Sequence, residues 1–248
     1  MSTENLLFFI MTYLKNNTLQ EVHAGMFDMK QDMCNKLIHI LHPIVCKCLE
    51  EFRPIDNTEV LNEKAKNGGY LAADCTERRV QRDSHCQEDY YSGKKKIHAL
   101  KNFLIVNVMT LVVFLSSSKP APVHDKKMAE EAKIILPPGI IIGLDSGFQG
   151  LDIAGGATIE MPKKKPKNKD LTDDEKKANT LKASKRVIVE NTIAHCKVLR
   201  TAKDVLRWHK DERKDLLFAT AVRLHNFKVC RKRNIKPPLI TNNLANYS

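Results

Sequence analysis

The sequence has no apolar run long enough to cross a membrane. Its longest apolar stretch, residues 103–115, is interrupted by Asn107 and Thr110, whereas a membrane-spanning helix needs about 20 consecutive apolar residues. The apolar block 6–11 near the start follows Glu4, with no basic segment before it and no small-residue cleavage site behind it. This pattern argues against a secretory signal. We therefore expect no transmembrane helix and no membrane partner.

Paired cysteines are also missing. The seven cysteines are an odd number, and none forms a Cys-x-x-Cys pair or a Cys/His grouping of zinc-finger spacing. Reduced thiols in a cytosolic compartment explain such cysteines best, so we expect a cytoplasmic protein. Tryptophan occurs once, as Trp208, and we expect it in the core rather than as a platform for stacked bases.

Acidic residues are too few to balance the basic ones. The 248 residues include 41 Lys and Arg against 29 Asp and Glu, which gives a formal charge of +12. Such a chain is drawn to polyanions because counterions are released when they bind. Nucleic acid is therefore the leading partner, and a cytoplasmic protein of this charge is expected at the nucleoid. The apolar content of 42% is ordinary for a soluble globular protein.

Residues 1–53 have a helical pattern. Apolar residues from 37 to 49 recur at helical spacing on one long helix, bent or interrupted near Pro43. Residues 18–21, Thr-Leu-Gln-Glu, are a capping-box signature for a shorter helix before it.

A helix-turn-helix is one interpretation of residues 22–37. Ala24 would be the small contact residue, and residues 27–29 a tight turn in which Asp28 tolerates a left-handed conformation. Lys30, Gln31 and Asn35 would then face a DNA groove. A helical hairpin that only packs is the alternative.

The remainder predicts an α/β fold, a mixed sheet flanked by helices. We expect a polar linker over 54–69, a second domain over 70–230 and a basic tail over 231–248. Strands are expected at 70–76, 96–107, 110–117, 140–144 and 157–161, and helices at 124–133, 172–200 and 211–228. The second of these helices opens with another capping box, at 172–175.

Three carboxylates are candidates for one metal site. Asp74 and Asp145 end apolar strand-like runs, and Glu190 lies in a basic helical stretch. Side chains beyond the ends of neighbouring parallel strands meet, and clustered carboxylates favour Mg²⁺.

Each of the three acids has a simpler explanation. Asp74 could be satisfied by backbone, Asp145 could form a turn, and Glu190 could pair with Arg186. Three other acids could replace one of the three, with Asp125 the most serious competitor: Glu77, Asp125 and Asp152.

Basic residues with interleaved aromatics are candidates for phosphate contacts near these acids. A solvated loop is the alternative for the first group. The groups are Arg82, Tyr91, Lys94, Lys95, Lys96, His98 and Lys101, then Lys163, Lys164 and Lys165, and finally Arg186, Lys197 and Arg200.

Six segments in this order resemble a DDE transposase of a bacterial insertion sequence, close to the branch related to eukaryotic Harbinger elements. The segments are residues 74–77 (DCTE), 90–98 (YYSGKKKIH), 136–139 (LPPG), 145–150 (DSGFQG), 162–166 (PKKKP) and 186–190 (RVIVE). The resemblance covers roughly residues 18 to 228.

The resemblance implies an RNase H-like catalytic domain that cuts and joins DNA at element ends with two Mg²⁺ ions, which Mn²⁺ could replace. By match to its motifs, Asp74, Asp145 and Glu190 would bind the metal. Because element ends come in pairs, a homodimer in a synaptic complex is expected. Two other readings stay open: a decayed or repurposed transposase that only binds DNA, and a general nuclease without strand joining.

Overall fold

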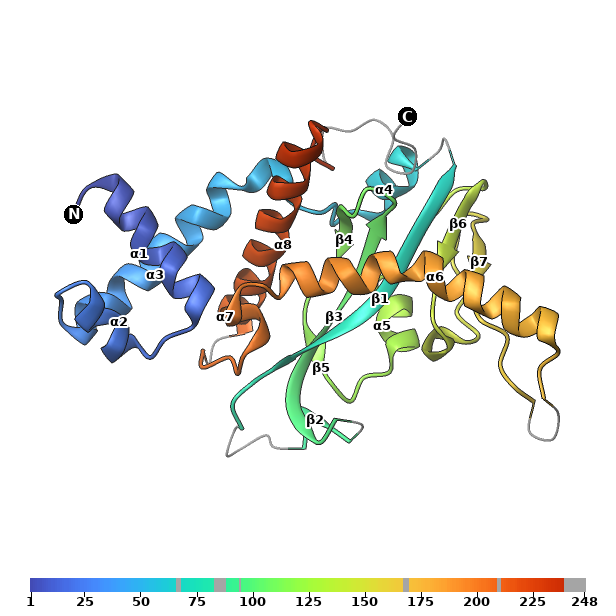
Figure 1. The fold of residues 1–248 in the computed structure, drawn as a ribbon, viewed down its shortest axis with the longest axis horizontal. Coiled ribbons are helices and arrows are strands. Elements are labelled where there is room, and N and C mark those ends of the chain that lie inside the picture. Colours follow the sequence, from blue (N-terminus) through green and yellow to red (C-terminus); the bar gives the residue numbers. More distant parts are fainter. Residues whose placement is uncertain (66–67, 83–87, 94, 167–169, 209–210, 239–248) are drawn as a thin grey trace.

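A mixed sheet with helices on both faces forms the centre of the molecule (Figure 1). The computed structural model describes residues 1–65, 68–82, 88–93, 95–166, 170–208 and 211–238. In that part of the chain the sheet has seven strands in the order β2-β3-β1-β6-β7, with β4 and β5 also paired to β3. The predicted mixed sheet flanked by helices is therefore present, while its kinship to RNase H stays a prediction.

Five of the strands follow the predicted apolar runs, whereas the two-residue strands β2 and β5 were not predicted. The strands are β1 (Gly69–Arg79), β2 (Tyr91–Ser92), β3 (Ile97–Asn107), β4 (Val112–Leu115), β5 (Lys119–Pro120), β6 (Ile140–Gly143) and β7 (Thr158–Glu160). β1 continues beyond its expected end because it pairs with β3 as far as Arg79 and Ala99. β1 pairs in parallel with β6, and β6 with β7. This parallel half of the sheet carries the candidate site.

The helices match the predicted pattern except α4, which lies in the segment expected as a linker, and the short α7, which was not predicted. The helices are α1 (Thr3–Asn16), α2 (Gln20–Met26), α3 (Gln31–Cys48), α4 (Thr58–Lys64), α5 (Asp125–Glu131), α6 (Asp173–Cys196), α7 (Arg200–Lys203) and α8 (Asp211–Arg233), with 3-10 turns η1 (Glu50–Phe52) and η2 (Ser146–Phe148). α8 is longer than expected, so the predicted tail begins inside a helix. Residues 239–248 of that tail lie outside the described residues.

In the N-terminal helical block, residues 1–53, the structure confirms the predicted turn but not the predicted capping box. Asp28 has φ 51°, so the turn between α2 and α3 is left-handed at the expected residue. The capping box at Thr18 was wrong, because Leu19 is the N-cap of α2 and the Thr18 hydroxyl lies 3.4 Å from Nδ1 of His23 instead. α3 continues as one helix through Pro43.

Two apolar cores lie against the sheet. In the first, Leu61 of α4 and Met128 of α5 pack with Phe103 of β3. In the second, Phe9 of α1 packs in one cluster with Leu104 of β3 and Phe218 of α8. The N-terminal helices therefore share a core with the sheet. The segment 54–69, expected as a linker, contains α4, and the division into domains stays a prediction.

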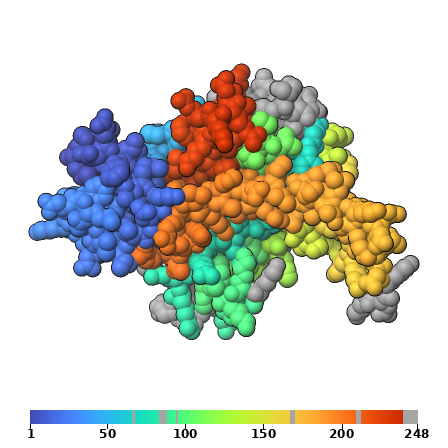
Figure 2. Space-filling view, in the orientation of Figure 1, coloured from blue at the N-terminus to red at the C-terminus, as the bar shows by residue number. Residues whose placement is uncertain are grey.

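α6 runs across one face of the sheet, and its N-terminal half projects beyond the body of the molecule (Figure 2). A capping box on Thr172 opens this helix, as the sequence predicted. Searched over the described residues, no helix is long and apolar enough to span a membrane.

Candidate active site

Asp74 and Asp145 come from two adjacent parallel strands. The pairing of Ala72 with Gly143 places these acids at the same level, two residues further along each strand. Asp145 follows β6 and caps η2, where its Oδ1 accepts a hydrogen bond of 2.7 Å from the Gly147 amide. Asp74 ends the apolar part of β1 but lies in the middle of the strand. The expected neighbourhood of the two acids is therefore present, although only Asp145 follows a strand end.

Arg186 connects Asp74 to Glu190. Both Arg186 and Glu190 lie on α6, one turn apart, and the Arg186 Nη2 atom is 3.0 Å from Glu190 Oε1. Nη1 of the same guanidinium is 3.9 Å from Asp74 Oδ2. The simpler explanation for Glu190, an ion pair with Arg186, is thus present in the structure. The same pair brings Glu190 to the edge of the sheet that carries Asp74.

Burial and neighbouring acids make ionised Asp74 unfavourable. Burial raises the pKa of Asp74 to about 6; the hydrogen bond from the Cys75 amide lowers it, the negative charges of Asp145 and Asp125 raise it, and Arg186 lowers it. The Cys75 amide donates to Asp74 Oδ1 at 2.8 Å. A cation at this position would offset the repulsion between the carboxylates.

Asp125 belongs to the same group of acids. It begins α5 and forms an ion pair of 2.9 Å with Lys101. A Cβ atom built on Gly147 would lie 2.9 Å from Asp145 Oδ1 and 3.2 Å from Asp125 Oδ2, so both carboxylates border the same small space. The sequence named Asp125 as a competitor, but only the packing of α5 against η2 places it here.

The carboxylates do not form a closed metal cage. Within the described ranges, no three His, Cys, Asp or Glu side chains are grouped so that they could hold one ion. Arg186 lies between Asp74 and Glu190 and contacts both. The structure thus supplies oxygen donors of the kind that Mg²⁺ prefers, on three neighbouring elements, with a guanidinium among them.

The basic hairpin β2–β3 differs from the prediction at one residue. The Tyr91 and His98 rings lie with centroids 5.4 Å apart and planes tilted by 57°, and Lys95 pairs with Glu77 at 3.3 Å. Lys96 and Arg82 are exposed, while Lys94 lies outside the described residues. Lys101 was expected to contact phosphate, but it is buried.

Lys101 is not available to DNA because its Nζ donates to the Val123 carbonyl oxygen as well as to Asp125. It serves instead to hold the start of α5 against the sheet.

The basic residues around α6 are largely paired within the chain. Lys163 contacts Glu175, Lys165 lies 2.6 Å from Asp170, and Lys164 is exposed. Arg200 pairs with Asp204 at 2.9 Å. Three of these basic residues, Lys163, Lys165 and Arg200, therefore already have an acidic partner within the chain.

Lys197 is held at the C-terminal end of α6. Its Nζ donates to the Glu77 carbonyl oxygen at 2.7 Å, and burial lowers the pKa of Lys197 to about 8.

At the start of α3, Lys30 and Gln31 are exposed, and Asn35 donates to Gln20 Oε1 at 2.9 Å. Lys30 and Gln31 are thus exposed, as expected for residues that face DNA, whereas Asn35 is half-buried. Contact of these residues with DNA stays a prediction.

Comparison with known proteins identifies the class to which this arrangement belongs. Residues 73–226 match the family described as "DDE superfamily endonuclease", and the chain belongs to this family. The match spans Asp74, Asp125, Asp145 and Glu190.

Over 137 residues the chain is 25% identical to a "Probable transposase for insertion sequence element IS702" of Microchaete diplosiphon; the alignment covers 55% of this chain and 49% of that protein. The chain thus matches about half the length of this curated relative. The resemblance to a DDE transposase of an insertion sequence is confirmed.

Proposed function

We propose that this protein is a DNA transposase that cleaves element ends and joins them to target DNA by two-metal-ion phosphoryl transfer. One observation supports the proposal: at one edge of the parallel half of the sheet Asp74 of β1 lies near Asp145, and Arg186 of α6 contacts both Asp74 and Glu190. All of these residues lie inside the stretch that matches the endonuclease family. Asp74, Asp145 and Glu190 would hold two Mg²⁺ ions, and Mn²⁺ could replace them.

Two ions about 3.5–4 Å apart would activate water or a 3′-hydroxyl and stabilise the leaving oxygen. For Asp74 to bind metal it must first lose the proton that burial favours, and Arg186 must release at least one of its two carboxylates. The Lys101–Asp125 pair borders the same space and would keep α5 in place while these groups rearrange.

DNA would reach this edge along the basic surface. In this proposal the catalytic domain, residues 70–230, is RNase H-like, and the helices of residues 1–53 act as a helix-turn-helix module whose Lys30 and Gln31 face a groove. Two copies in a synaptic complex would present two such sites to the paired element ends.

Strand joining separates a transposase from a general nuclease. The test supplies pre-cleaved element ends and a target plasmid with Mg²⁺ or Mn²⁺. A transposase joins the ends to the plasmid, whereas a nuclease leaves no joined product. Absence of joining with retained, metal-dependent cutting would overturn the transposase proposal in favour of the nuclease.

A decayed or repurposed DNA-binding protein is the second candidate. The observation that favours it is the contact of Arg186 with both Asp74 and Glu190, because a fixed guanidinium would take the place of a metal ion. Binding to element-end DNA that persists in EDTA, without nicking when Mg²⁺ or Mn²⁺ is added, would support this candidate.

A further inference from the structure

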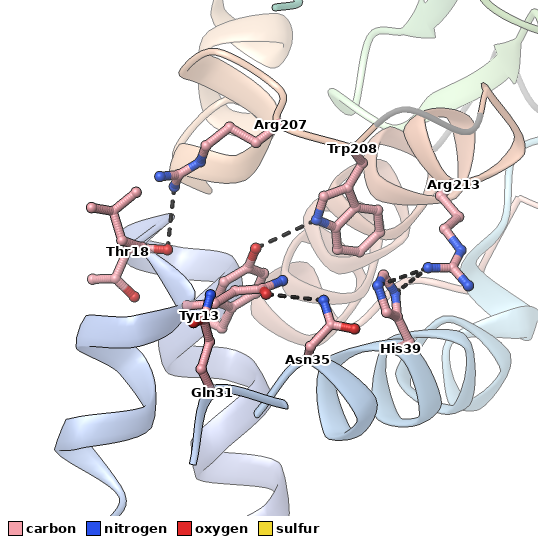
Figure 3. A pocket seen from close by; sticks show the side chains of 10 residues that line it. Tyr13, Thr18, Gln31, Asn35, His39, Arg207, Trp208 and Arg213 are labelled. Atoms are coloured by element: carbon pink, nitrogen blue, oxygen red, sulfur yellow. Dashed lines mark hydrogen bonds between the residues drawn. The ribbon is translucent and has the colours of Figure 1, made fainter. Parts of the chain in front are cut away.

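A cavity of about 450 Å³ lies where the N-terminal helices meet the segment that leads into α8 (Figure 3). Its size is within the range of small-ligand sites. Side chains from α1, α2, α3 and α8 share in its walls. The lining residues are Tyr13, Thr18, Leu19, Gln20, Gln31, Asn35, His39, Arg207, Trp208 and Arg213.

Two arginines give the cavity a positive charge. Arg207 Nη2 donates to the carbonyl oxygens of Asn17 and Thr18, the latter at 3.2 Å. Arg213 Nη1 lies 2.8 Å from His39 Nε2. Among the lining residues that the structure describes none is acidic, and the contacts described for these two guanidinium groups are with neutral oxygens and an imidazole. An anionic ligand would give both guanidinium groups a negatively charged hydrogen-bond acceptor.

The remaining walls supply neutral donors and a rigid support. The Asn35 amide donates to Gln20, which fixes both amides at the cavity. Trp208 is held by the hydroxyl of Tyr13, 3.4 Å from its Nε1, and by the rings of His39 and His42. In Figure 3, Arg207 and Arg213 lie on opposite sides of Trp208. Arginine with amide and hydroxyl donors is the usual set that contacts phosphates of DNA.

The position of the cavity beside the start of α3, where the proposed function places DNA, is the reason for considering DNA rather than a small anion. Gln31 is exposed at the start of α3 and Asn35 lies one turn later, and both line the cavity. A DNA strand that follows the start of α3 would therefore pass over the two arginines.

We infer that this cavity binds a phosphodiester group of the DNA backbone through Arg207 and Arg213. The contact would tie the N-terminal helices to the body of the molecule when DNA is bound. The inference rests on the proposed function only in that the ligand is DNA.

The single tryptophan makes the test specific, because excitation at the long-wavelength edge of the absorption band selects Trp208, in the cavity wall, over the five tyrosines. The full chain is titrated in EDTA with duplex DNA, and separately with inorganic phosphate. Binding to the duplex is also measured by fluorescence anisotropy at several salt concentrations. The variants are Arg207→Gln and Arg213→Gln. Arg231→Gln, an exposed arginine at the other end of α8, is the matched control.

Duplex DNA is expected to change Trp208 fluorescence with saturation, and phosphate is not. Each cavity variant should lower the slope of log affinity against log salt by about 1, the loss of one phosphate contact. Arg231→Gln should keep the parent slope. Arg213→Lys keeps the positive charge and should therefore retain most of the slope. A parent-like slope in this variant shows that substitution at this position does not by itself prevent folding.

Parent-like slopes in both glutamine variants would overturn the inference. So would a Trp208 response to phosphate without one to DNA, which would make the cavity a small-anion site. Because these measurements contain no metal, they do not depend on cleavage. The expected DNA binding at this cavity, together with no cutting or joining in the separate assays with Mg²⁺ or Mn²⁺, would count against the transposase alone. Cleavage with unchanged binding by both variants would count against the cavity alone.

Discussion

Arg186 is the residue on which the two interpretations of Glu190 differ. It was expected to contact DNA, yet its guanidinium lies between two acids of the candidate site. If Glu190 is only its partner in an ion pair, then removing either residue should have the same effect. If Glu190 is a metal ligand, then its substitution should weaken metal binding, whereas substitution of Arg186 should not.

We therefore expect Glu190→Gln to weaken Mn²⁺ binding, roughly tenfold or more by comparison with losses around other metal sites. Arg186→Gln should leave Mn²⁺ binding unchanged or tighter, because it removes a competing cation. Isothermal titration calorimetry measures both. Equal losses in the two variants would show that Glu190 is not a ligand.

The raised pKa of Asp74 predicts a pH dependence with a defined sign. The folded value is about 6 and the reference value is 3.8, so between these values the folded state binds more protons than the unfolded state. The free energy of unfolding of the metal-free protein should therefore fall as pH rises from about 4 to about 6. The contribution is about 3 kcal/mol for a shift of this size.

In the Asp74→Asn variant the contribution of Asp74 to the fall in the free energy of unfolding with rising pH should be absent. Thermal unfolding of parent and variant in EDTA, from pH 4 to 7, measures the difference between them. The same proton must leave before metal binds, so Mn²⁺ affinity of the parent should rise with pH up to about 6 and then level off. A difference between parent and variant that does not change over this range would contradict the assignment.

At the residue scale the sequence predicted that Asp74 and Asp145 are neighbours, while their role as metal ligands stays a prediction, and it did not predict the burial of Lys101. Asp74 and Asp145 could be placed together because parallel strands align their ends. The burial of Lys101 could not, since the carboxylate that holds it comes from α5, 24 residues away in the chain.

The helices show which local signals are sufficient. Both ends of the capping box on Thr172 are present: its hydroxyl accepts from the Glu175 amide at 3.3 Å, and Glu175 accepts from the Thr172 amide at 2.9 Å. The same kind of signature failed at Thr18, where a histidine one turn later takes the hydroxyl. A capping-box signature thus predicts the cap only where no other side chain takes the threonine hydroxyl.

Thr172→Ala should therefore destabilise the projecting end of α6 by about 1 kcal/mol, the usual effect of losing an N-cap. Because this end is exposed, we expect faster amide hydrogen exchange over residues 173–177 and little change in the global unfolding midpoint. Ser184→Ala, in the interior of the same helix, is the control. Unchanged exchange in Thr172→Ala would mean that other contacts hold this end.

For the whole molecule, the main feature that the sequence did not reveal is the shared core. Phe9, Leu104 and Phe218 lie far apart in the chain, and no local pattern links an N-terminal helix to a strand and to the last helix. The strands themselves were predictable from their apolar runs, and the parallel pair β1–β6 from the order of elements.

The shared core predicts one cooperative unfolding transition for the full chain. Urea titrations followed by Trp208 fluorescence and by far-ultraviolet circular dichroism should coincide, since Trp208 belongs to the same cluster. Two separated transitions would show that residues 1–53 and the rest fold as independent domains.

Mn²⁺-supported cleavage of the repeat DNA that flanks the element is the direct test that these acids form one catalytic site. The parent should cut this DNA, Asp145→Asn should lose cutting by several orders of magnitude, and Asp152→Asn, an exposed acid on the segment that follows η2, should cut like the parent. If Asp145→Asn cuts as well as the parent, then Asp145 does not hold the metal and the proposed site is wrong.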